Sequence, residues 1–238
     1  NMGRFAVPTS QLQQGWMNTS ALSVVDAEKL TFEGGIVLDE PEHGAAGIWD
    51  IKSVGDKVYV THSGTHDLSV IDYPAMAAKL RSYTGTKEQL SYDLRFMYGI
   101  RERVKLTGNG PRKMAVSKDG KQLYIPTYFS DTLNVFDLSG NTVGAAVAQV
   151  ENRKETDVQA GERIFNDAAY CFQNWQSCNG CHPGDARTDG MNWDLMNDGI
   201  GNPKNCKSLL YSHFTPPCMI SGIRADAAIA DRKGFTHI

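Results

Sequence analysis

Short hydrophobic runs that alternate with polar loops dominate the first 150 residues. Residues 58–61 and 68–72 form two such runs, rich in β-branched side chains and joined by a Gly/Ser/Asp loop. Residues 123–127 and 133–137 repeat this arrangement, with the same 13-residue step from Tyr59 to Asp72 as from Tyr124 to Asp137. Runs of this kind predict antiparallel hairpins with at least one buried face.

The two pairs belong to a longer repeat with an offset of 65 residues. Gly55-Asp56-Lys57 precedes the first pair and Gly120-Lys121-Gln122 precedes the second. A looser third copy comprises residues 5–9 and 22–26, with a longer loop between them. In the last copy, residues 114–125 add a further strand and an Asp-Gly turn. Three consecutive antiparallel strands make up most of a propeller blade, and a generic meander or sandwich is the alternative.

These residues resemble the YVTN-type β-propeller repeat of bacterial and archaeal surface-layer and secreted proteins. The first copy departs from that pattern, with Ala6 at the Tyr position and Pro8 inside the run. Family blades span about 40–45 residues, and the surplus here falls at residues 73–103, where residues 75–80 predict an inserted helix or long loop. Three units do not close a ring, because propellers have at least four blades. Since the chain also begins without a signal-like segment and ends within an apolar pattern, we expect it to be part of a longer polypeptide.

A second domain is expected after residue 150. Residues 151–156 form a charged linker, and Asp157 is the expected N-cap of a helix. One helical face then carries Gly161, Ile164, Phe165, Ala168, Ala169 and Phe172. The predicted fold is therefore multidomain: all-β propeller-like blades, about three repeats in residues 1–150, followed by a mainly α-helical, cytochrome c-like domain in residues 157–238.

The strongest chemical signal is Cys178-Asn179-Gly180-Cys181-His182, the C-x-x-C-H motif of c-type haem attachment. Two thiols on one helical turn add to the two vinyl groups of haem, and the adjacent His ligates the iron. A zinc site is one alternative, with Cys178 and Cys181 joined by Cys206, Cys218 or His213, but no second C-x-x-C is present. A thioredoxin-like pair is another, but it would require a βαβ context that is absent.

Residues 161–238 resemble the cytochrome c domain that accompanies YVTN propellers. That domain is similar to the first haem domain of the dihaem cytochrome c peroxidase and MauG group. The resemblance rests on residues 161–167, 171–178, 189–195, 201–205, 215–219 and 222–224. It implies a haem c (iron) cofactor held by Cys178, Cys181 and His182. The peroxidase ligand opposite the proximal His would fall near Asn205, and Asn does not ligate haem, so that role does not carry over.

The second iron ligand is expected to be Met219, which lies 37 residues after His182. The alternatives are an open position or the side chains of His213, His237, Met191 and Met196. Cys171, Cys206 and Cys218 are not needed for attachment, and a disulfide between two of them would suit an exported protein. Trp175 and Trp193 are expected to be core aromatics rather than porphyrin contacts. The acidic and basic residues 185, 187, 189 and 194 are expected in a solvated loop rather than at a haem edge.

Composition narrows the function. The 238 residues are 41% hydrophobic and 21% charged, with a net charge of -3, which fits a globular protein and opposes nucleic-acid binding. No apolar stretch reaches the roughly 20 residues of a membrane helix. We expect a periplasmic or cell-surface c-type cytochrome that transfers electrons through one haem to an unidentified redox partner, with the propeller as docking surface.

Two other functions stay open at this point. One is a cytochrome c peroxidase or MauG-like oxidoreductase completed by missing sequence, since this chain has a single C-x-x-C-H and no Glu after Glu162. Whether the chain is an enzyme is therefore undecided. The other is a haem-free surface-layer scaffold.

Overall fold

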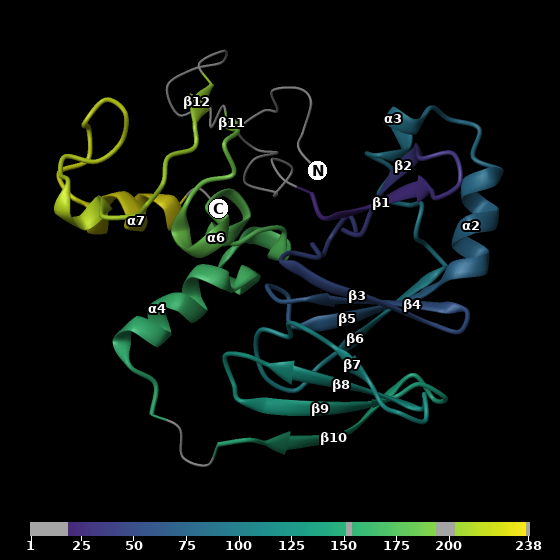
Figure 1. Cartoon of the computed structure of the whole chain (residues 1–238). Coiled ribbons are helices and arrows are strands. Elements are labelled where there is room, and N and C mark those ends of the chain that lie inside the picture. Colours follow the sequence, from purple (N-terminus) through teal and green to yellow (C-terminus); the bar gives the residue numbers. More distant parts are fainter. Residues whose placement is uncertain (1–18, 151–153, 194–202, 237–238) are drawn as a thin grey trace.

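The computed structural model describes residues 19–150, 154–193 and 203–236, and it consists mostly of antiparallel β-sheets (Figure 1). Two four-stranded sheets keep their strands in chain order. The first contains β3 (Ile48–Val54), β4 (Lys57–His62), β5 (Asp67–Asp72) and β6 (Arg101–Lys105). The second contains β7 (Ala115–Val116), β8 (Gln122–Thr127), β9 (Thr132–Asp137) and β10 (Thr142–Ala148). A two-stranded sheet, β1 (Ala21–Asp26) and β2 (Thr31–Val37), precedes them.

The repeat appears in the strand register. Tyr59 lies opposite Val70 in the β4–β5 pair, and Tyr124 lies opposite Val135 in the β8–β9 pair, each shifted by the same 65 residues. Both predicted hairpins are confirmed. Each sheet also has a fourth strand, β6 or β10, that the sequence pattern did not predict. The strand expected from residue 114 is reduced to the two residues of β7, and residues 5–9 lie outside the described part.

The first four-stranded sheet is buried on both faces. Side chains alternate between the two faces along each strand, so neighbouring residues enter different cores. Val58 and Val60 of β4 pack into one core with Ile36, Leu38, Ile71 and Phe96. Tyr59, between them, points into a second core with Leu68, Leu123, Ile125 and Phe136. The three sheets therefore stack face to face through two separate hydrophobic cores, as blades do in a propeller.

The predicted insertion forms helix α2 (Tyr73–Arg81) and the short helix α3 (Lys87–Leu90). The Asp72 side chain accepts a hydrogen bond from the Ala75 N–H, and Pro74 occupies the first turn, so α2 begins where the sequence favours a helix. The last residues of the predicted insertion, from Arg101, belong to β6 instead.

The C-terminal part is only partly helical in the described residues. Its longest helices are α4 (Asp157–Asn166) and α7 (Ala227–Phe235), of ten and nine residues. Shorter elements are α5 (Cys178–Cys181), α6 (Pro183–Ala186), the strands β11 (Asn192–Trp193) and β12 (Lys204–Asn205), and the 3₁₀ turns Ala168–Tyr170, Phe172–Asn174 and Ser212–Phe214. Within the described ranges, no helix has the length and apolarity needed to cross a bilayer.

A buried polar cluster closes one end of the first four-stranded sheet. His62 is completely buried; its Nδ1 donates to the Ala45 carbonyl (3.0 Å), and its Nε2 accepts from the Ser69 hydroxyl (2.8 Å). Burial lowers the pKa of His62 to about 4. Burial also raises the pKa of Asp39 to about 6, against the effect of the Ala45 and Ser20 N–H groups that donate to it.

These two pKa changes act on stability in opposite directions. The stability that His62 contributes is present above its unfolded pKa of 6.5 and is lost as pH falls toward 4. The contribution of Asp39 is present below its unfolded pKa of 3.8 and is lost as pH rises through 6. Each amounts to roughly 3 kcal/mol, so the two largely cancel between pH 4 and 6.5.

Replacing His62 with Gln removes the pH-dependent contribution of His62 to stability and leaves that of Asp39. We expect the variant to gain stability relative to the wild type by about 3 kcal/mol when pH falls from 6.5 to 4, since Asp39 then titrates unopposed. Urea unfolding of both proteins at several pH values measures the difference. A difference that stays constant across the range would show that His62 is not held neutral by burial.

Candidate functional site

Helix α4 leads the chain from the sheets to the motif. Its N-cap is Thr156, not the expected Asp157, and Thr156 forms a reciprocal capping box with Gln159. The helix ends at Asn166, so the expected helical face does not continue to Phe172. The Asp167 side chain instead accepts from the Ala169 N–H and caps the following 3₁₀ turn.

The next segment, residues 167–176, is attached by backbone hydrogen bonds to loops of the first four-stranded sheet, namely the segment before β3 and the β4–β5 turn. The Ala168 N–H donates to the Gly64 carbonyl (3.0 Å), and the Gly44 N–H donates to the Gln173 carbonyl (2.7 Å). Trp175 is 1% exposed and is therefore a core residue, as predicted. Trp193 lies on β11, but its side chain is outside what the structure describes.

A buried His–Asp pair reinforces this attachment. The Gly110 N–H donates to Nδ1 of His66 (3.0 Å), so the proton of neutral His66 lies on Nε2, which donates to Asp167 (3.1 Å). Burial by itself would raise the pKa of Asp167, but the hydrogen bonds from His66 and the Ala169 N–H lower it overall. The motif thus follows a segment that the β-sheets hold in place.

The motif occupies the four-residue helix α5 and the residue after it. Cys178 and Cys181 lie one turn apart, and His182 ends the helix, its N–H donating to the Cys178 carbonyl (3.0 Å). Nδ1 of His182 lies 3.4 Å from the Arg187 carbonyl. A hydrogen bond to this carbonyl would keep the proton on Nδ1 and leave Nε2 as the ligand atom, a common arrangement for metal-binding histidines.

All five cysteines are free thiols in the structure. Burial raises the pKa of Cys181 to about 12 and also raises the pKa of Cys178, of Cys206 and of the buried Cys171. No pair forms the disulfide considered from the sequence. Across the described residues, no three His, Cys, Asp or Glu side chains gather as metal ligands, so the zinc alternative finds no preformed site.

Cys206 is the residue beside the motif that the sequence did not single out for this role. Its Sγ lies 3.5 Å from Nδ1 of His182 and 3.1 Å from the Cys181 carbonyl. The sequence suggested Cys206 as a disulfide or zinc residue, but nothing in its spacing indicated contact with this imidazole.

Of the candidate second ligands, Met219, His213 and Met191 lie within the described residues. Met219 is 47% exposed in a turn with a positive φ of 72°. His213 stacks on Phe214, with ring centroids 4.0 Å apart. Met191 is exposed, and Met196 and His237 lie outside the described residues. The ligand role of Met219 stays a prediction.

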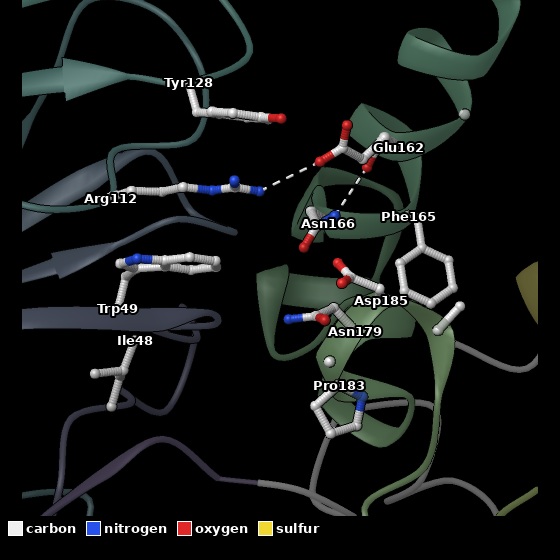
Figure 2. Close-up of a pocket in the computed structure, with 13 residues that line it drawn as sticks. Ile48, Trp49, Arg112, Tyr128, Glu162, Phe165, Asn166, Asn179, Pro183 and Asp185 are labelled. Carbon is white, nitrogen blue, oxygen red and sulfur yellow. Dashed lines mark hydrogen bonds and ion pairs between the residues drawn. The ribbon is translucent and has the colours of Figure 1, made fainter. Parts of the chain in front are cut away.

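A cleft of about 610 Å³ separates the β-sheets from the motif-bearing segment (Figure 2). One wall carries Ile48, Trp49, Arg112 and Tyr128 from the two four-stranded sheets and their loops. The opposite wall carries residues of α4 and α5 and the turn after the motif, namely Glu162, Phe165, Asn166, Asn179, Pro183 and Asp185. Asp185 is exposed, as expected from the sequence, and it also lines this cleft. No sequence signal marked Arg112.

Fold and site define a protein of stacked antiparallel sheets whose C-terminal segment presents a C-x-x-C-H motif beside a cleft. Over 60 residues, 25% of this chain, the sequence is 40% identical to hydrazine synthase subunit gamma of Kuenenia stuttgartiensis. The matched stretch covers 17% of that protein. No known protein-family profile matches the chain.

Three solved structures are similar in part. Hydrazine synthase of Kuenenia stuttgartiensis aligns with 53% of this chain and 37% of its own, with a TM-score of 0.47 and 24% identity. The dihydro-haem d1 dehydrogenase NirN aligns with 55% of this chain and 24% of its own, with a TM-score of 0.36 and 14% identity. A Lactobacillus plantarum protein aligns with 58% of this chain and 38% of its own, with a TM-score of 0.38 and 14% identity. Similarities this low define neither a family nor an activity for this chain.

Proposed function

We propose that the chain is part of an exported c-type cytochrome. One haem is attached through Cys178 and Cys181, His182 ligates its iron, and the protein transfers single electrons. The observation that carries this proposal is the local geometry of α5, where two unpaired thiols lie one turn apart and the next residue is a histidine. Haem, when bound, supplies the one-electron couple of its iron.

The surroundings of the motif fit an apolar macrocycle. The segment after residue 209 exposes many large apolar side chains: Leu210, Tyr211, Phe214, Met219, Ile220, Ile223 and Phe235. Helix α7 lies close enough for the charge of Asp231 to interact with His182. A porphyrin attached at α5 would cover such side chains where they face the motif.

We assign the second iron position to Met219. Its thioether is half exposed on a turn that the chain reaches 37 residues after His182, and a thioether is a common haem ligand. The ferric protein should show the Met-to-iron charge-transfer band, and Met219→Ala should abolish it. An unchanged band in this variant would assign the position to another residue.

The β-sheets serve in this proposal as the docking scaffold for a redox partner in the periplasm or at the cell surface. The support is the attachment of residues 167–176 to the first four-stranded sheet, which holds the motif at a fixed place against it. The 60-residue similarity to a synthase subunit transfers no activity to this chain.

The test is production of the full chain in a host with cytochrome c maturation enzymes. We expect a c-type α band in alkaline pyridine and a peptide containing residues 178–182 that is heavier by one haem. The same host, making a known c-type cytochrome, serves as the control for maturation. A haem-free product beside a matured control would overturn the proposal.

A further inference from the structure

Arg112 lies in the cleft between the sheets and the motif, and its guanidinium makes few polar contacts there. The Arg112 guanidinium lies 3.6 Å from the ring centroid of Tyr128 and 4.3 Å from that of Trp49, so two aromatic rings fix its plane (Figure 2). Its backbone is fixed too, because the Arg112 carbonyl accepts a hydrogen bond from the Thr61 hydroxyl (2.7 Å). Nε of Arg112 is buried and has no hydrogen-bond partner in the described part of the chain.

The ion pair across the cleft does not satisfy this guanidinium. Nη2 of Arg112 lies 3.6 Å from Oε1 of Glu162, which is beyond hydrogen-bonding distance, and Glu162 is 43% exposed. A guanidinium binds a carboxylate best through two parallel N–H···O hydrogen bonds. The rigid, underused donors of Arg112 therefore favour a ligand carboxylate that displaces Glu162.

The opposite wall determines what else such a ligand needs. Among the residues that the structure describes, the charged ones lining the cleft are one cation, Arg112, and two carboxylates, Glu162 and Asp185. A simple anion would leave both carboxylates unpaired beside its own charge, and a simple cation would face Arg112. A ligand with a carboxylate and a protonated amine pairs with both walls, while Trp49 and Phe165 offer apolar surface to its body.

We propose that this cleft binds a small zwitterion of the amino-acid type, with its carboxylate on Arg112 and its ammonium group between Glu162 and Asp185. Asn166 and Asn179 supply further polar groups along the same wall. Cys178, Cys181 and His182 do not line the cleft, although Asn179 between them does, so the side chains that would contact the zwitterion differ from those that attach haem.

The test uses the full chain and three probes in calorimetric titrations. L-Phenylalanine carries both charged groups, 3-phenylpropanoate lacks the amine, and 2-phenylethylamine lacks the carboxylate. We expect saturable binding of L-phenylalanine and at least about tenfold weaker binding of each analogue. Arg112→Gln should weaken binding of L-phenylalanine by at least about tenfold. Arg163→Gln, the same substitution at an arginine of α4 that pairs with Glu155 outside the cleft, should not.

Three results would overturn the proposal: absence of saturable binding to the wild type, equal binding to Arg112→Gln, or equal binding of an analogue that lacks one charge. The NMR signal of the Trp49 indole N–H in the wild-type protein gives a second readout that needs no variant. It should shift on titration with L-phenylalanine, and an unmoved Trp49 signal would place any binding elsewhere. This measurement decides the question even if Arg112→Gln does not fold.

Discussion

The double variant Cys178→Ala/Cys181→Ala should carry no covalent haem when it is produced with maturation enzymes, whereas the wild type carries one. Each thiol forms one thioether bond, so removing both leaves no covalent link between porphyrin and chain. A haem stain after denaturing electrophoresis and the mass of the intact protein measure the effect directly. The expected change is complete loss rather than a reduction.

Cys218→Ala is the matched control for this experiment. Cys218 is a free thiol outside the motif, and its Sγ contacts the Ser212 carbonyl (3.7 Å). We expect this variant to retain its haem. Covalent haem that persists in the double variant would show that another residue forms the link.

Trp175→Ala should destabilise the chain by about 3–5 kcal/mol, the usual loss for a large aromatic side chain removed from a core. Trp175 is 1% exposed and sits where residues 167–176 dock on the first four-stranded sheet. The loss should therefore also detach the motif-bearing segment from that sheet. Urea unfolding gives the stability change, and proteolysis near residue 175 reports the detachment.

Gly44→Ala tests the same contact from the other side. A Cβ at position 44 would lie 2.3 Å from the Trp175 Cα and 2.4 Å from the Asn174 carbonyl oxygen, and backbone at that distance cannot move aside cheaply. We expect it to weaken docking as Trp175→Ala does. Tyr98→Ala, at a side chain 88% exposed, should change stability by less than about 0.5 kcal/mol. Equal losses in all three variants would show that the effect is not specific to this contact.

Local patterns predicted the elements that local interactions form. The hairpins β4–β5 and β8–β9 follow from β-branched runs and short polar loops, and α2 follows from Asp72 as a cap and Pro74 in the first turn. The predicted N-cap of α4 was wrong by one residue, because Thr156 and Asp157 both have side chains that can cap a helix. The predicted continuation of α4 to Phe172 was wrong because Asp167 is held by a hydrogen bond from His66, 101 residues away in the sequence.

The candidate site was likewise predictable from the sequence only where its residues are close together in the chain. Cys178, Cys181 and His182 were identifiable because haem attachment needs five consecutive residues with fixed spacing. The contact of Cys206 with His182 and the attachment of residues 167–176 to Gly44 and Gly64 have no such local signature.

The sequence by itself determined the repeated hairpins, the inserted helix and the attachment motif, since each depends on residues only a few positions apart. The tertiary structure alone decided that Trp49, Arg112 and Glu162 meet across one cleft beside the motif. Those three residues come from different elements separated by 50 or more positions, and the docking of residues 167–176 on loops of the first four-stranded sheet brings Glu162 opposite the other two. No pattern along the chain encodes that packing, because it depends on the shapes of surfaces that exist only after the sheets have formed.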